Sequence, residues 1–426
     1  MTAESLLERR YRVLGRNSPL FYDRPLHLVR GEGVWLWDAE GNRYLDAYNN
    51  VPHVGHSHPH VVEAMARQAA LLNIHTRYLH EGVVSYAERL TRTFDPDLSM
   101  LMLTCSGSEA NELALRIANV TTGGKGVICT NCSYHGNTVA VAQISTMFTP
   151  PEGFGPHIRA VDPPDSYRGI DGLTGQALED AYVARIEGAI ESLNAQGIRL
   201  AAMLICTMYS SEGLPIVPAG FMPRAVAAVH KAGGLFIADE VQGGFGRTGQ
   251  HMWGHQRFGV TPDLVTLGKP MGNGHPVAGV VGRADLVQGF RDRVMYFNTF
   301  AGNPVSCAAA NAVLDVLESE QLQANAVAIG SYLAGGLREL ATRHEAIGDV
   351  RSLGMFFAVD LVDDRERKTP ASALAKRVIN GMCERGVLIS RIGPHDNVLK
   401  IRPPMPFGRA HADQLLATLD EVLAAG

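Results

Sequence analysis

The chain has 426 residues, of which 46% are hydrophobic and 19% charged, and its formal net charge is −5 at pH 7. This composition predicts an ordinary soluble globular protein with a large core, either two or three domains or one large α/β unit with a smaller one attached. The mild charge argues against a nucleic-acid-binding surface, and no apolar run approaches the ~20 residues of a membrane helix. Six cysteines in so long a chain do not indicate a disulfide framework, which favours the reducing cytoplasm as the location.

The N-terminal part predicts a helix and then a hairpin. The opening stretch, MTAESLLERRYRVLG, is charged and helix-like, unlike a signal peptide. Residues 33–50, GVWLWDAEGNRYLDAYNN, alternate apolar and polar side chains around a turn at 40–42, which predicts a β-hairpin. The stretch 52–60, PHVGHSHPH, then carries four histidines, and histidine is the commonest metal ligand. Pro59 suits the first turn of a helix, so a helix is expected to begin there.

From about residue 60 to 310, short apolar runs alternate with amphipathic stretches. Buried strands are predicted at 101–104, 127–130, 201–206, 235–239 and 263–269, and a typical intervening helix at 223–234 ends in glycines. This order is the signature of a mostly parallel sheet with helices on both faces. The segment 162–175 predicts a surface loop from its Pro, Gly and Asp content.

After about residue 311 the sequence predicts a smaller α+β unit. The expected elements are a long helix at 311–322, a strand at 355–362, a helix near 371–384 and strands at 387–390 and 398–401. The chain is therefore expected to divide into an N-terminal segment, 1–59, a large domain, 60–310, and a small C-terminal domain, 311–426, with which the N-terminal segment packs.

The stretch CSGSEANELALRIA, residues 105–118, suggests a phosphate site. It follows a strand and predicts a helix whose start is capped by Ser106 and Glu109 in an S-x-x-E box. Free N–H groups, small side chains and two hydroxyls at this start would seat a phosphate. An ordinary strand-to-helix turn accounts for the motif equally well.

Two further stretches place a carboxylate and an amine at strand ends. Asp239 and Glu240 stand where a strand ends before glycines, and ligands of open α/β sheets bind at such ends. Taken alone, a helix cap or a salt bridge is the simpler explanation for this pair. Lys269 ends another strand in a glycine-rich loop, and a desolvated lysine has a lowered pKa and can form a Schiff base with an aldehyde. The phosphate seat, the carboxylate and the amine together suit the phosphate, ring nitrogen and aldehyde of pyridoxal 5′-phosphate (PLP), whose protonated ring acts as an electron sink.

Over nearly all of its length the chain resembles the class III aminotransferases of the fold-type I PLP superfamily. The resemblance implies an α/β fold, with a large domain built on a mostly parallel seven-stranded sheet and a smaller α+β domain. It implies that Lys269 is the Schiff-base lysine and proton shuttle, that Asp239 pairs with the ring nitrogen and that Tyr134 stacks on the ring. The other implied cofactor contacts are Ser106, Gly107, Ser108, His135, Val241 and Gln242, with Thr299 contributed by the neighbouring subunit of a homodimer and Asn298 assisting.

Several stretches are most similar to the ethanolamine-phosphate phospho-lyase branch, which also includes hydroxylysine-phosphate enzymes and relatives named alanine–glyoxylate aminotransferase. They are YNNVPHVGHSHPHVV, RYLHEG, GKPMGNGHPVAGVV, YFNTFAGNPVSCAAANAVLD and GPHDNVLKIRPPMPF. Many class III transaminases carry E-P-x-Q-G-E-x-G where this chain has CTMYSSEG, residues 206–213. Ser211 stands at the second Glu, the partner of a switch arginine that Arg402 matches. That partner is thus missing or displaced to Glu212.

The lost pairing favours a phospho-lyase over a transaminase. The switch lets one site accept two substrates in turn, whereas a phospho-lyase expels phosphate from a single substrate. An unpaired Arg402 suits phosphate, Arg77 and Tyr78 are weaker candidates for the same task, and Asn50 and Val51 are expected beside the substrate. The leading substrate is O-phosphoethanolamine, converted into acetaldehyde, ammonia and phosphate. The alternative is an aminotransferase that moves an amino group from an amine or amino acid to pyruvate or glyoxylate.

The four histidines motivate a remote alternative, a non-enzymatic metal-binding protein. Their loop holds no cysteine or acidic residue to complete a tetrahedral site, and the lone C-x-x-C pair of Cys129 and Cys132 is a weak zinc signal. In the family that the chain resembles, G-H-x-H-P is a recurrent structural turn, and the NNV stretch before it, residues 49–51, lies beside the PLP pocket. No metal, nucleic acid or membrane partner is therefore expected, and His53 is a candidate substrate contact.

Overall fold

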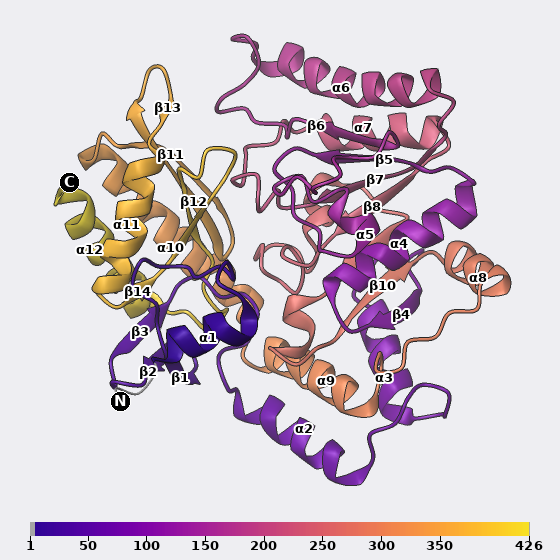
Figure 1. Ribbon diagram of the computed structural model, residues 1–426, viewed down its shortest axis with the longest axis horizontal. Coiled ribbons are helices and arrows are strands. Elements are labelled where there is room, and N and C mark those ends of the chain that lie inside the picture. Colours follow the sequence, from indigo (N-terminus) through magenta and orange to yellow (C-terminus); the bar gives the residue numbers. More distant parts are fainter. Residues whose placement is uncertain (1–4, 426) are drawn as a thin grey trace.

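A computed structural model describes residues 5–425 and shows a seven-stranded sheet in the larger part of the molecule (Figure 1). Its strands follow the order β4 (Met100–Thr104), β10 (Ala278–Gly282), β9 (Leu264–Leu267), β8 (Leu235–Asp239), β7 (Leu200–Cys206), β5 (Gly126–Thr130) and β6 (Ile158–Val161). Only the two pairs that β10 makes in this sheet are antiparallel. The predicted α/β fold with a mostly parallel seven-stranded sheet is confirmed.

Helices cover both faces of this sheet. One face packs against α4 (Gly107–Thr122) and α8 (Ala284–Arg293), and the other against α6 (Gly175–Ala195) and α7 (Phe221–Lys231). Within β8, Phe236 belongs to the core on the α6–α7 side and Ile237 to the core on the α4 side. A strand buried on both faces reads as a continuous apolar run, which makes β8 recognisable in the sequence.

A second sheet lies in the smaller part, in the order β11 (Ile347–Leu353), β12 (Phe356–Asp364), β16 (Val398–Ile401) and β15 (Ser390–Ile392), with β13 (Thr369–Pro370) paired to β12. The helices of this part are α10 (Leu322–Arg343), α11 (Ser372–Glu384) and α12 (Arg409–Ala424). The predicted N-terminal hairpin forms as β2 (Trp35–Asp38) and β3 (Arg43–Asp46), with β1 (Leu28–Glu32) beside it. β3 pairs in parallel with β14 (Val387–Leu388), so the N-terminal strands join the C-terminal part.

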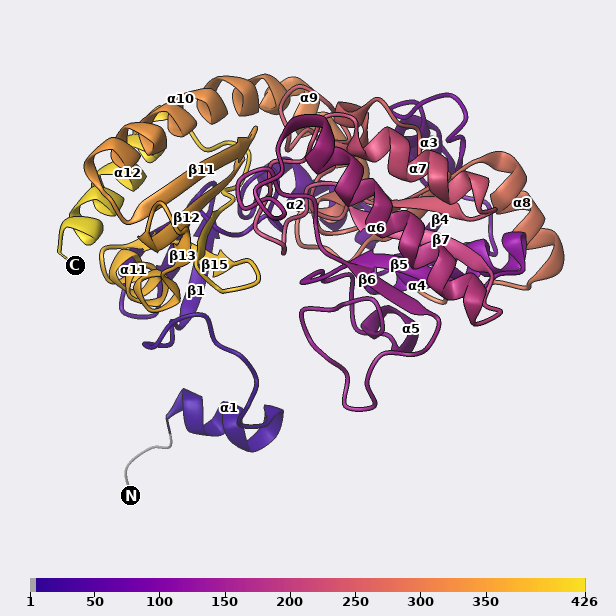
Figure 2. The ribbon, with the colours of Figure 1, turned by 90° about the horizontal axis from the view of Figure 1, so that it is seen from above.

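The remaining helices connect the two parts or stand apart from them. α2 (Pro59–Leu71) and α3 (Glu81–Thr91) pack on α9 (Pro304–Ser319). Figure 2 shows α1 (Leu6–Leu14) projecting from the body of the molecule. A short helix, α5 (Val139–Ala142), and two 3-10 turns, η1 (Gly254–Phe258) and η2 (Lys269–Gly272), lie in the connections of the large sheet. Within residues 5–425 no helix has both the length and the apolar character needed to cross a membrane.

The helix predicted at 311–322 has different bounds in the structure. It begins at Pro304, because the side chain of Asn303 caps it by accepting a hydrogen bond from the backbone N–H of Ser306 at 2.9 Å. It ends at Ser319, and Gln321 takes the left-handed conformation (φ 50°) before α10 begins. A local turn therefore divides what the apolar pattern alone presents as one helix.

Candidate active site

A pocket of about 570 Å³ lies between the carboxyl ends of the central strands and the edge of the smaller sheet, a size typical of small-molecule sites. Four of the residues predicted for the site line it, namely Tyr134, Gln242, Lys269 and Arg402. The other lining residues are Phe21, Tyr48, Cys132, Met147, Phe148, Ser211, Ser390, Arg391, Ile392, Gly393, Pro394, Asp396 and Lys400.

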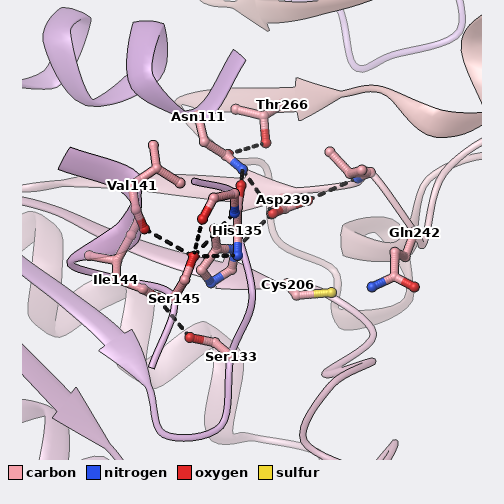
Figure 3. A network of polar contacts seen from close by, with 12 residues as sticks. Asn111, Ser133, His135, Val141, Ile144, Ser145, Cys206, Asp239, Gln242 and Thr266 are labelled. Atoms are coloured by element: carbon pink, nitrogen blue, oxygen red, sulfur yellow. Dashed lines mark hydrogen bonds and ion pairs between the residues drawn. The ribbon is translucent and has the colours of Figure 1, made fainter. Parts of the chain in front are cut away.

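Asp239, the last residue of β8, is buried and held by a network of donors (Figure 3). One of its oxygens lies 2.7 Å from Nδ1 of His135 and 3.1 Å from Nδ2 of Asn111, and the other accepts the backbone N–H of Val241 at 3.0 Å. Asn111 is fixed in turn, since its Oδ1 accepts the hydroxyl of Thr266 at 2.7 Å. The carboxylate therefore has one defined orientation at the end of the strand.

The same contacts set the charge of Asp239. Burial acts to raise its pKa, but the hydrogen bond and the charge of His135, the backbone N–H of Val241 and the charge of Lys269 together lower it, so the pKa of Asp239 lies below its usual value. An ionised carboxylate at this position can hold a cationic ring nitrogen.

Lys269 follows β9 as the first residue of η2, and its side chain lines the pocket. Burial lowers the pKa of Lys269, the positive charge of Arg402 lowers it further, and Asp239 offsets part of the shift. A lowered pKa favours the neutral amine, the form that can attack an aldehyde or accept a proton.

The start of α4 has free donors, as the S-x-x-E motif predicts. The hydroxyl of Ser106 accepts the N–H of Glu109 at 3.3 Å, and the Glu109 carboxylate accepts the N–H of Ser106 at 3.0 Å, which confirms the capping box. The N–H groups of Gly107 and Ser108 have no acceptor among the described residues. Gly136 (φ +138°) lies so close that a Cβ there would be 2.3 Å from the Ser108 hydroxyl, so the loop after Tyr134 can meet α4 only through a glycine.

Arg402 is buried and has no carboxylate partner within the described chain. Its Nε donates to the backbone carbonyl of Tyr48 at 3.0 Å, its Nη1 donates to the side-chain oxygen of Gln242, and its guanidinium lies 4.7 Å from the Tyr48 ring centroid. Glu212 does not take the place of the lost partner, because its carboxylate accepts the Thr130 hydroxyl at 2.6 Å. Of the two alternatives, the partner is missing rather than displaced.

Sequence reasoning missed several lining residues. Lys400 lies in β16, and Arg402 comes directly after the last residue of that strand, Ile401. Two positions is the spacing that places side chains of an extended backbone on one side, and both side chains line the pocket. This signal was present in the sequence. No local pattern indicated Phe21 or Phe148, which come from distant segments and pair edge-to-face with Tyr48 and Tyr134 at 5.0 and 6.0 Å between ring centroids.

Thr299, expected from a neighbouring subunit, does not line this pocket, and neither do the other predicted residues Asn298, Arg77 and Tyr78. Thr299 is exposed, the guanidinium of Arg77 stacks on Phe297 at 3.9 Å, and Tyr78 is 62% exposed. Asn298 is held locally, because its side-chain oxygen accepts the N–H groups of Phe300 and Ala301, both at 3.3 Å, and its amide donates to Glu109 at 3.4 Å. Within a single chain these side chains do not reach the pocket.

Asn50 and Val51, expected beside the substrate, are not among the residues that line the pocket. Asn50 is buried, and its amide has no hydrogen-bond partner in the described part of the chain, whereas Val51 is 38% exposed.

The four clustered histidines share no common partner. His56 bonds Asp46 at 2.7 Å, His58 bonds Glu320 at 2.9 Å and His60 bonds Asp315 at 2.8 Å. His53 is fully buried, with Nε2 donating to the carbonyl of Phe245 at 2.7 Å and Nδ1 accepting from Arg247 at 3.1 Å. His53 therefore supports the loop and does not face the pocket.

We expect the free energy of unfolding to fall less steeply with decreasing pH in His53→Gln than in the wild-type protein. Burial and then the charge of Arg247 hold the pKa of His53 well below its ordinary value. Below pH ~6.5 the unfolded chain takes up a proton that the folded protein does not, so wild-type stability falls with pH by up to about 1.4 kcal/mol per pH unit from this residue. Urea unfolding between pH 7.5 and pH 5 measures the slope, with exposed His27→Gln as control. Equal slopes in wild type and H53Q would contradict the prediction.

Replacing Asn111 by alanine should destabilise the fold and loosen Asp239. The change leaves two buried groups without their hydrogen-bond partner. They are the hydroxyl of Thr266 and the carbonyl of His135, which accepts from Asn111 at 2.8 Å. Each buried group left unpaired costs about 1–3 kcal/mol, so the urea midpoint should fall clearly. Asn119→Ala, at an exposed position of the same helix, should change stability far less, and equal losses in the two variants would count against the network.

Comparison with known proteins places the chain in a family. The family described as aminotransferase class-III matches residues 21–423. The chain belongs to the class III aminotransferases. It is 42% identical to an alanine–glyoxylate aminotransferase 2-like protein of Drosophila melanogaster, over 98% of this chain and 87% of that protein. It is 36% identical to ethanolamine-phosphate phospho-lyase homolog 1 of Caenorhabditis elegans, over 99% and 93%. A phospholyase from Arthrobacter, solved in complex with phosphoethanolamine, is 51% identical with a TM-score of 0.96, over 99% of this chain and all of that chain.

Class III aminotransferases use PLP, and the pocket's own residues fit that cofactor. Asp239 offers an ionised carboxylate for the ring nitrogen, Lys269 an amine of lowered pKa for the aldehyde, and the start of α4 free N–H groups for the phosphate. Space is tight beside Val241, since a Cβ on Gly107 would lie 3.2 Å from its side chain. The resemblance inferred from sequence motifs, the enzyme class and the cofactor are thus confirmed.

Proposed function

We propose that this protein is a PLP-dependent phospho-lyase that converts O-phosphoethanolamine into acetaldehyde, ammonia and phosphate. The observation that carries the proposal is the unneutralised positive charge of the pocket. Arg402 and Lys400 both line it; Arg402 is paired with a neutral amide instead of a carboxylate, and Lys400 forms no ion pair within residues 5–425. Buried cations without counter-charges are costly, and a dianionic phosphate would relieve that cost.

The likeness to a phospholyase solved with phosphoethanolamine supports the same substrate class. Guanidinium groups bind phosphate in a two-pronged geometry, and Arg402 is held in place for this by Tyr48 and Gln242. The aromatic side chains of Phe21 and Phe148 line the pocket and pack edge-to-face against Tyr48 and Tyr134.

In the proposed reaction, Lys269 gives way to the substrate amine and then removes a proton from the carbon that bears this amine. Asp239 keeps the ring nitrogen protonated throughout, because His135 and Asn111 hold its carboxylate ionised and oriented. PLP, when bound, supplies an electron sink that makes this proton removable. The phosphate on the adjacent carbon then departs toward Arg402.

The second candidate is an aminotransferase that uses pyruvate or glyoxylate as acceptor. The 42% identical relative is named alanine–glyoxylate aminotransferase 2-like, which favours this alternative. Both reactions share the proton removal by Lys269. They diverge afterwards, because the lyase expels phosphate whereas the aminotransferase returns the proton and releases a keto product.

The deciding experiment supplies O-phosphoethanolamine without any keto acid. Catalytic release of phosphate, ammonia and acetaldehyde is expected. No turnover there, with alanine formed once pyruvate and an amine donor are added, would overturn the phospho-lyase in favour of the aminotransferase.

We also propose a homodimer in which Thr299 reaches the cofactor phosphate of the neighbouring site. Exposed apolar side chains cluster in the segments around Thr299 and Arg77, with Leu79 100%, Phe300 72% and Tyr78 62% exposed. Such surface is costly to leave in water and typical of an interface. Sedimentation equilibrium should give twice the chain mass of 45.9 kDa, and a monomer that turns over normally would refute this proposal.

A further inference from the structure

Lys400 occupies a position that the reaction above does not use. It lies in β16, opposite Ala358 of β12 and Ser390 of β15, so its backbone is fixed in the middle of a sheet. The residue is only 4% exposed, yet its side chain lines the pocket beside Lys269 and Arg402.

The ammonium of Lys400 has no hydrogen bond or ion pair with any of residues 5–425. Its Nζ lies 5.4 Å from the ring centroid of Phe356. The one carboxylate that lines the pocket, Asp396, faces Arg391 at 3.7 Å. A buried amine in this setting lacks the partner that buried charges require, and an anion in the pocket would provide one.

Few groups in the pocket can give up a proton to a departing phosphate. The guanidinium of Arg402 does not deprotonate in proteins, and Lys269 is engaged in taking a proton from carbon. Burial raises the pKa of the Cys132 thiol to about 12, which makes it a poor donor. Lys400 remains, with the phenols of Tyr48 and Tyr134 as competitors.

We propose that Lys400 is a further catalytic residue, which binds the substrate phosphate as an ammonium and donates a proton to it as the carbon–oxygen bond breaks. The inference rests on the phospho-lyase function proposed above and assigns the acid of that reaction. Arg402, which is clamped by Tyr48 and Gln242, supplies fixed charge, whereas Lys400 supplies charge that can be transferred as a proton.

The step balances. Lys269 takes the proton from the carbon that bears the amine, and the electron pair of that bond forms the carbon–carbon double bond. The pair of the breaking carbon–oxygen bond stays on the bridging oxygen, which receives the Lys400 proton, so that phosphate leaves as HPO₄²⁻. Lys400 is then a neutral amine and is reprotonated from solvent before the next turnover.

The surroundings of Lys400 favour this transfer. Burial, the charge of Arg402 and the charge of Lys269 hold the pKa of Lys400 well below its ordinary value, while Cys206 and Glu212 offset part of that shift. The bound dianion stabilises the ammonium until the phosphate begins to leave, and the neutral amine is then tolerated among two other cations.

The test compares two leaving groups in the PLP-loaded enzyme. Lys400→Arg keeps the charge but cannot donate the proton, so kcat for phosphate release from O-phosphoethanolamine should fall by ~10²-fold or more with little change in KM. O-Sulfoethanolamine is nearly isosteric, and its sulfate needs no proton to leave, so ammonia release from it should fall less than about tenfold. Lys400→Met should in addition raise KM for the phosphate ester.

A separate readout controls for folding and cofactor loading. Deuterium uptake from D₂O into ethylamine, beside the nitrogen, reports proton removal by Lys269 and should be unchanged in K400R. Lys400 is not the acid if K400R loses turnover of both esters equally, keeps full phosphate release or loses deuterium exchange. It is also not the acid if Tyr48→Phe or Tyr134→Phe instead slows phosphate release much more than release from the sulfate ester. A wild-type enzyme that releases no phosphate overturns the proposed function itself and Lys400 with it, which distinguishes the two failures.

Discussion

Lys269→Ala is expected to abolish turnover, with a loss of at least ~10⁴-fold, because the variant lacks both the amine that bonds the cofactor and the base that moves the proton. No other side chain replaces it. Lys400 is held in β16 and Arg402 is fixed by Tyr48 and Gln242. The purified variant should also lose the yellow colour of lysine-bound PLP, so that absorbance and product release measure the same loss in two ways.

Lys231→Ala is the matched control. Lys231 is the exposed last residue of α7, far from the strand ends that form the pocket, and should leave colour and rate unchanged. A K269A protein that remains yellow and turns over would remove the basis for the enzyme assignment. So would a colourless wild-type protein that refuses added PLP.

Asp239→Asn is expected to lower kcat/KM by roughly 10²- to 10⁴-fold. The amide preserves the shape of the side chain but removes the charge that keeps the ring nitrogen protonated, and loss of one member of a buried charge pair costs about 3–5 kcal/mol. His135 would also lose the ionised partner that lies 2.7 Å from its Nδ1. Rates of product release measured at saturating PLP separate this effect on catalysis from weaker binding of the cofactor.

A second buried carboxylate provides the comparison. Asp263 accepts the N–H of Phe236 at 2.8 Å and bonds His230 at 2.7 Å, at the opposite end of the strands from Asp239. Asp263→Asn should reduce stability and spare kcat. Equal losses of kcat in the two variants would mean that Asp239 serves the fold alone.

The central strands could be predicted because burial on both faces leaves an unbroken apolar run. The runs at 127–130, 201–206 and 235–239 correspond to β5, β7 and β8. β6 and β10 were not identified, because β6 is a short edge strand and β10, Ala278–Gly282, is short and carries two glycines. The antiparallel direction of β10 follows from its partners, which no local pattern encodes.

For the site, the sequence indicated candidate residues where a local motif carries a suitable chemical group. The capping box at Ser106, the strand-end carboxylate and the strand-end lysine each combine a residue type with a local position. Lys400 was not predicted, although it stands two positions before Arg402, the spacing that places side chains of an extended backbone on one side. Phe21 comes from a segment remote in sequence, and its place is settled only by tertiary packing.

The parallel pair between β3 and β14 has a consequence for synthesis of the chain. Leu45 pairs with Val387, so the N-terminal strands cannot complete their sheet until nearly the whole chain has left the ribosome. At ~5–20 residues per second this delay is roughly 20–70 s. During that time the hairpin exposes an unpaired strand edge. A partly synthesised chain with such an edge aggregates readily and is bound by chaperones. Truncation before residue 387 should therefore yield insoluble protein or chaperone-bound protein, even though the seven-stranded sheet is complete by residue 282.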